Sequence, residues 1–158
     1  MPRSLDPAIV SALGSLGVAT RDLAAGKQRH DDALLRRARH LDRPDRMLFE
    51  ASVVRGLSTR HLAALMQVHA GTVARRLTSI RRRLTDPRVA AVVDAGNPLT
   101  PTDRAIAIGH LLRRRTIGEL ARETSRTPPI VRQRLIYVRG WLQGRRDAAF
   151  ALRQARAA

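Results

Sequence analysis

Apolar residues recur along this chain with the three-to-four-residue spacing that is typical of amphipathic helices. The clearest apolar stripe comprises Val73, Leu77, Ile80 and Leu84. It predicts a helix over residues 70–84, with a shorter helix over residues 59–66 before it and the turn Gln67-Val68-His69 between them. No run of residues alternates between apolar and polar as a half-buried strand does. The pattern therefore predicts an all-α fold.

The same pattern occurs twice along the chain. The segment Arg55 to Leu84 reappears as Arg113 to Leu142, 58 residues later, the separation of Leu62 from Leu120. The identical pairs are Arg55/Arg113, Leu62/Leu120, Ala63/Ala121, Val73/Val131, Arg76/Arg134, Leu77/Leu135, Arg81/Arg139 and Leu84/Leu142. A chain rich in Arg, Ala and Leu can align with itself by chance, but this alignment needs no gap and its matches fall where a fold needs them. We therefore predict two tandem three-helix units.

Proline, glycine and capping residues divide the chain into four segments. Asp42 before Pro44 and Thr100 before Pro101 are typical helix starts, and each opens one unit. We expect an N-terminal helical arm in residues 1–41, a first unit in 42–97, a second unit in 98–144 and a basic helical tail in 145–158. Within the arm we expect weak helices over residues 7–16 and 20–41. The arm could instead be part of the core of the first unit or be partly disordered, but we favour an accessory arm.

The charge of the chain indicates the class of its partner. Thirty Lys and Arg residues against thirteen Asp and Glu residues give a net charge of +17, and every basic residue except Lys27 is Arg. A charge of this size attracts polyanions, of which nucleic acid is the commonest. A planar guanidinium suits phosphate and guanine, although a GC-rich genome would also favour Arg over Lys. The net charge of +17 needs an explanation whichever of these accounts for the preference for Arg.

Several classes of function are disfavoured by what the sequence lacks. Cysteine is absent, which excludes disulfides and thiolate-bound zinc. The five histidines have no metal-ligand spacing, and there is neither a glycine-rich phosphate loop nor a recognisable catalytic triad. We therefore expect no enzyme, no catalytic residue, no metal and no cofactor. No stretch approaches the roughly 20 apolar residues of a membrane span, and we expect no membrane association and a cytoplasmic, nucleoid-associated location.

One family resemblance is visible in the first unit. Its points of likeness are Gly56-Leu57-Ser58, Leu62-Ala63, Gly71-Thr72-Val73, Arg76-Leu77, Arg81, Arg83 and Leu84. This segment of about thirty residues resembles region 4 of bacterial sigma-70 factors, their C-terminal helix-turn-helix domain. The resemblance implies that residues 70–84 form a recognition helix for the major groove of DNA. The family's usual acidic residue after the serine is His61 here, and Gln67 stands where glycine is usual in the turn.

The resemblance is limited in two further ways. Residues 1–41 lack the length and the aromatic residues of sigma region 2, so we do not expect a stand-alone sigma factor. The second unit matches less well, because Glu123, Thr124 and Arg126 replace apolar residues of the first unit. We expect a diverged unit there.

The outward positions of the predicted recognition helix supply the candidate site residues. The candidates for contact with DNA bases are His69, Thr72, Arg75, Arg76 and Ser79. The candidates for contact with phosphate are Ser58, Arg60, Arg81, Arg82 and Arg83. The corresponding positions of the second unit are Arg132, Gln133, Arg134 and Tyr137. Since Tyr137, Ile130 and Trp141 add apolar surface there, the second unit either contacts DNA or packs on another part of the protein or another subunit.

The leading hypothesis is a sequence-selective double-stranded DNA-binding protein that regulates transcription. One alternative is a helical adaptor that binds RNA polymerase or another protein, because region 4 domains also dock on polymerase. Another is a non-specific nucleic-acid-binding protein, although an aromatic content of 3% offers little for the stacking that single strands need. A homodimer is compatible with all three. The target sequence and the choice between activation and repression stay open.

Overall fold

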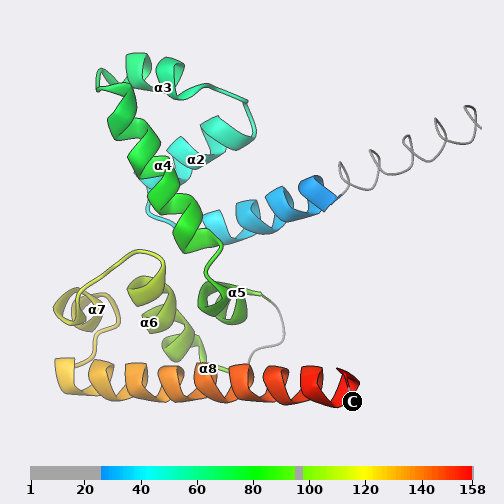
Figure 1. Ribbon diagram of the computed structural model, residues 1–158. Coiled ribbons are helices and arrows are strands. Elements are labelled where there is room, and N and C mark those ends of the chain that lie inside the picture. The colour runs from blue at the N-terminus through cyan, green and yellow to red at the C-terminus, as the bar shows by residue number, and fades with distance from the viewer. Residues whose placement is uncertain (1–25, 95–97, 158) are drawn as a thin grey trace, which may run out of the picture.

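Helices make up most of the described chain. The structure is a computed structural model that describes residues 26–94 and 98–157 (Figure 1). The first helix covers residues 26–38, and it is followed by α2 (Arg43–Val53), α3 (Thr59–Met66), α4 (Ala70–Leu84), α5 (Pro87–Val93), α6 (Pro101–Leu111), α7 (Ile117–Glu123) and α8 (Pro128–Ala157). No strand occurs in these residues, so the all-α prediction is confirmed. The helix expected over residues 7–16, and the start of the one expected over 20–41, lie outside the described residues.

The helix starts repeat with the separation found in the sequence. Helices α2, α3 and α4 begin 58 residues before α6, α7 and α8 respectively. Ser58 and Thr116 are equivalent N-caps, and their side chains accept hydrogen bonds from the backbone N–H groups of His61 and Glu119. In both copies the short middle helix packs on the long helix that follows it. Figure 1 shows the two copies one above the other, with α5 between them.

The turns repeat as closely as the helices. Within the described chain, a left-handed φ occurs at Gly56 (63°), Gln67 (54°), Arg114 (59°) and Ser125 (52°), which are two pairs at the same 58-residue separation. The residues after Gln67 and Ser125 close the turns in the same way. The N–H of Val68 donates to the carbonyl of Ala63 at 3.0 Å, and the N–H of Arg126 donates to the carbonyl of Ala121 at 2.9 Å. This closure is a common end for a helix, and its left-handed position favours glycine. Gln67 therefore occupies a position whose backbone shape favours glycine.

Both copies contribute to one continuous apolar core. The predicted stripe is buried at all four positions of α4. The cluster that contains it extends from Leu34 through Leu84 and Val89 to Leu142. A smaller cluster of Ile106, Leu120, Ala121 and Val131 fills the second copy. Because the larger cluster includes α5 and part of α8, the two copies are packed together.

The N-terminal segment differs from the accessory arm that we favoured. The side chains of Leu34, Ala38 and Leu41 are 5%, 0% and 4% exposed. From the same helix, Nη1 of Arg37 donates to the carbonyl of Leu84 at 2.9 Å, and Nη2 pairs with Asp94 at 2.9 Å. Residues 26–41 are therefore part of the apolar core together with the first unit, which was the alternative to an accessory arm. At the other end, α8 continues without a break past residue 144, so the expected tail is part of that helix.

Arginine side chains join the copies to each other. Arg113 donates from Nε to the carbonyl of His40 at 2.8 Å, and Arg115 pairs with Asp42 at 3.1 Å. Burial, together with the nearby charges of Arg104, Arg113 and Arg39, lowers the pKa of His40 below its ordinary value. Part of the large positive charge therefore serves packing between helices.

Candidate nucleic-acid interface

The side of α4 opposite its buried stripe is polar and exposed. Helical spacing brings Arg75, Thr78 and Arg82 to the middle of this side, with Thr72 and Ser79 along one edge. We call these five residues the α4 outer face. All are exposed except Ser79, which is half-buried. The structure therefore brings together three of the predicted base-contact residues and one predicted phosphate-contact residue.

Thr78 belongs to this face although the sequence reasoning did not select it. It follows Arg75 by three residues and precedes Arg82 by four, the spacing of neighbours on a helix surface. That spacing was the signal that could have identified it. His69 lies at the start of α4, where its Nδ1 accepts the N–H of Gly71 at 3.1 Å, so the ring is engaged as a cap.

Arg76 and Arg83 have an internal partner. Nε of Arg76 lies 2.8 Å from one carboxylate oxygen of Asp45, and Nη2 of Arg83 lies 2.6 Å from the other. Nη1 of Arg83 also donates to the carbonyl of Leu112 at 2.7 Å. Burial raises the pKa of Asp45, but the hydrogen bonds and charges of Arg83 and Arg76 outweigh burial and leave it below its ordinary value.

Both arginines are predicted DNA contacts that the structure places in ion pairs. The Arg83 side chain is only 12% exposed, so little of it is accessible in this structure. Arg76 is 42% exposed, and its Nε–H links α4 to Asp45 of α2. The equivalent pair in the second copy is Arg134 with Asp103, at 3.4 Å. The identity of Arg76 and Arg134 in the repeat is thus explained by an internal contact.

The other predicted phosphate-contact residues lie around the same unit. Ser58 is occupied as the cap of α3, with its hydroxyl 3.1 Å from Nδ1 of His61. Arg60 is exposed on α3. Arg81 is exposed and lines a groove beside helix 26–38, together with Lys27. These side chains do not belong to the α4 outer face.

The surroundings of this face are uniformly basic in sequence. No Asp or Glu occurs between Glu50 and Asp86, whereas seven arginines do. Helices α3 and α4 lie wholly within this stretch. A polyanion approaching α4 therefore meets no carboxylate from either helix.

The second copy presents a different surface at the equivalent positions of α8. Arg132, Gln133, Arg134 and Tyr137 are all exposed, in agreement with their prediction as outward positions. The positions equivalent to Thr72, Thr78 and Ser79 are, however, Ile130, Ile136 and Tyr137, which are 39%, 69% and 54% exposed. On α8 the central position Ile136 and the edge positions Ile130 and Tyr137 are therefore apolar or aromatic where α4 is polar, whereas the central position Gln133 stays polar.

Comparison of the chain with protein-family models, with curated proteins and with solved structures finds no match. Among the described residues, no three His, Cys, Asp or Glu side chains are grouped as metal ligands. None of the described helices combines the length and the apolar composition needed to cross a bilayer.

Proposed function

We propose that this chain binds double-stranded DNA with sequence selectivity, as a regulator of transcription. In this proposal α3, the turn at residues 67–69 and α4 form a helix-turn-helix unit, and α4 enters the major groove. The observation that carries the proposal is the α4 outer face, a polar and exposed surface on a helix whose opposite side is fully buried. The basic stretch around it supplies attraction for the phosphate backbone.

Four of the five residues of the face have a chemical role in this proposal. Arg75 lies centrally, and its guanidinium can donate two hydrogen bonds to O6 and N7 of guanine. Thr72 and Thr78 can hydrogen-bond to base edges or contact the methyl group of thymine. Arg82, near the end of α4, and Arg60, on α3, are suited to phosphate, which gives affinity without sequence preference.

The second copy is proposed as a related helix-turn-helix frame that does not read bases. Its helix starts, turns and internal ion pair match the first copy. The apolar surface at Ile130 and Ile136 offers little for base recognition. In this proposal the two units are therefore unequal, because the first contacts bases and the second does not.

The roles of Arg75 and Arg82 are tested by a pair of variants. Arg75→Ala should weaken binding to the preferred duplex by about 1–3 kcal/mol and relax the preference at one base position. Arg82→Ala should weaken binding to every duplex alike and lower the slope of log K against log salt by about one. Fluorescence anisotropy with preferred and scrambled duplexes measures both effects, and Gln133→Ala on α8 is the matched control.

The assignment of Arg75 fails if both arginine variants weaken all duplexes equally. A large effect of Gln133→Ala would instead indicate that the second copy reads bases. Circular dichroism of each variant verifies that the helices are retained.

A second function is favoured by a separate observation. Leu65, Met66 and Val68, at the end of α3 and in the turn, are 73%, 41% and 41% exposed. Exposed apolar side chains gathered in one place are typical of protein contacts. They favour the helical adaptor, and the resemblance to region 4 makes RNA polymerase the partner to test. Capture of purified polymerase by a chain that lacks duplex affinity at physiological salt, with loss of capture in Leu65→Ser, would support the adaptor against the DNA reader.

A further inference from the structure

Arginine recurs at every seventh position along α8. The four residues are Arg132, Arg139, Arg146 and Arg153, and all of them are exposed. Because seven residues make almost two turns of an α-helix, these side chains lie along one side of α8, about 10 Å apart along its axis. We call them the α8 arginine row, which spans about 32 Å. Of the four, only Arg132 belongs to the DNA contacts predicted from the sequence.

The row carries positive charge that the packing of the chain does not use. Among residues 26–94 and 98–157, no carboxylate lies within ion-pair distance of any of the four guanidinium groups. Arg134 of the same helix, by contrast, pairs with Asp103 at 3.4 Å. The one acidic residue of α8 is Asp147, which accepts a hydrogen bond from Gln143 at 2.9 Å. The row is therefore free to meet an external anion.

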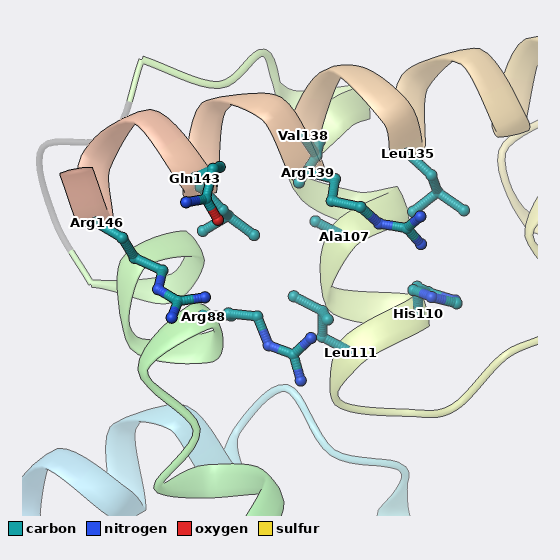
Figure 2. A pocket seen from close by; sticks show the side chains of 10 residues that line it. Arg88, Ala107, His110, Leu111, Leu135, Val138, Arg139, Gln143 and Arg146 are labelled. Carbon is teal, nitrogen blue, oxygen red and sulfur yellow. The ribbon is translucent and has the colours of Figure 1, made fainter.

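The row runs beside two adjoining pockets that α8 forms with the helices packed on it. Arg139 and Arg146 line the first, between α5, α6 and α8, and Figure 2 shows their side chains at separate ends of it. Arg146 and Arg153 line the second, between α5 and the C-terminal part of α8. Arg88 lines both pockets, but it is paired with Asp86 at 2.7 Å. The arginines of the row are thus spread along α8, which suits an extended polyanion.

Duplex DNA has the shape and charge that such a row needs. It carries about one negative charge per 1.7 Å of its axis, and one of its turns is about 34 Å long. A row of about 32 Å therefore spans about one turn. A single strand needs a succession of aromatic rings for stacking. Of the residues that line the two pockets, Phe150 is the only Phe, Tyr or Trp.

We propose that the α8 arginine row binds the phosphate backbone of duplex DNA without sequence preference. Its guanidinium groups pair with phosphates over about one turn of the duplex. The row and the α4 outer face are then two DNA-binding surfaces, one on each copy of the repeat. This inference rests on the proposed function for its partner, duplex DNA, but it does not require that α4 reads bases. The second copy supplies affinity and the first supplies selectivity.

Two pairs of substitutions on α8 test the row while removing the same charge. The row pair combines Arg139→Gln with Arg146→Gln. The control pair combines Arg145→Gln with Arg156→Gln, because both residues are exposed on the same helix but lie outside the row. Arg145 points about 100° away from Arg146, and its guanidinium lies 5.3 Å from the centroid of the Trp141 ring. Fluorescence anisotropy of the full chain with preferred and scrambled duplexes measures affinity over a range of salt concentrations.

The row pair should weaken binding about tenfold at physiological salt, the scale of two exposed ion pairs. It should also lower the slope of log K against log salt by about two. Both effects should be the same on preferred and scrambled duplexes, because phosphate contacts carry no sequence information. The control pair should change affinity by less than about threefold. Lysine at both positions of the row pair should restore the slope, since the contact depends on charge.

Equal weakening by the two pairs would show diffuse attraction to a chain of net charge +17 and would overturn the proposal. So would a row pair that loses affinity for a single strand and keeps its affinity for the duplex. Circular dichroism verifies that each variant retains its helices. Weakening by the row pair in a chain that selects no sequence motif would contradict base reading by α4 and support the α8 contact. A selected motif with no effect of the row pair would overturn the α8 contact alone.

Discussion

Removal of the Asp45 charge should destabilise the first unit by a predictable amount. Asp45 holds two arginines of α4 at once, Arg76 at 2.8 Å and Arg83 at 2.6 Å, and its side chain is 18% exposed. Asp45→Asn keeps the shape of the side chain and removes its charge. The substitution leaves Arg83, which is 12% exposed, with its charge uncompensated. The expected result is a lower free energy of unfolding with helicity preserved.

The magnitude follows from the exposure of each contact. A hydrogen bond to a charged group contributes about 1.5–3 kcal/mol where it is shielded from water, as the Arg83 contact is. The Arg76 contact is 42% exposed on the arginine side, so solvent reduces it to about 0.5 kcal/mol or less. The amide oxygen of the variant recovers part of the loss by accepting a hydrogen bond from one of the two arginines. The net cost of Asp45→Asn at pH 7 is therefore about 2 kcal/mol.

The effect should depend on pH with a definite sign. The folded-state pKa of Asp45 lies below its ordinary value because of the two arginines. The carboxylate therefore stabilises the fold fully above the unfolded pKa of about 3.9. That contribution is lost as the pH falls through the folded-state pKa. The difference between wild type and Asp45→Asn should be constant from pH 7 to about pH 5 and should narrow below about pH 4.

Urea unfolding followed by circular dichroism at 222 nm measures this difference at each pH. Asp147→Asn is the control, because Asp147 is exposed on α8 and accepts a hydrogen bond only from Gln143 among the described residues. That variant should lie within about 0.5 kcal/mol of wild type. A cost below about 0.5 kcal/mol for Asp45→Asn at pH 7, or a cost that stays constant down to pH 3, would refute the assigned role of Asp45.

Two further predictions concern the turns and the N-terminal helix. Gln67→Gly and Arg114→Gly should each raise the free energy of unfolding by up to about 1 kcal/mol, because φ is 54° and 59° there and glycine has no Cβ to clash; a loss of stability in urea unfolding would contradict this. Leu34→Ala should lower the free energy of unfolding by about 2–5 kcal/mol, as for a buried core leucine. Leu152→Ala, at a 65% exposed position, should change it by less than about 0.5 kcal/mol, and equal effects of the two leucine variants would place helix 26–38 outside the core.

The elements of the fold were largely predictable because their signals are local. The stripe from Val73 to Leu84 has helical spacing, and its side chains are buried in the structure. The 58-residue repeat places Ser58 and Thr116 as equivalent caps before helices of similar length. Such features depend on residues within a few positions of one another.

The partners of individual charged residues were less predictable, because they depend on contacts between distant segments. Arg83 meets Asp45 across 38 positions, and no local pattern indicates that contact. Asp45/Asp103 and Arg76/Arg134 are both preserved at the repeat distance, and together they could have indicated the shared ion pair. The burial of Leu34 likewise depends on helices that follow it in sequence. The charged residues near it in sequence gave no indication of that burial. The pocket between α5 and α8 needs three packed helices and has no signal in sequence.

The proposal that α4 reads DNA is tested most directly by selecting bound sequences from a random pool of duplexes at physiological salt. The full chain should enrich one motif, and Arg75→Ala should relax the preference at one position of that motif while leaving the rest. The Arg82→Ala chain should enrich the same motif with lower overall yield. An output pool indistinguishable from the input, or a motif unchanged by Arg75→Ala, would contradict recognition through the α4 outer face.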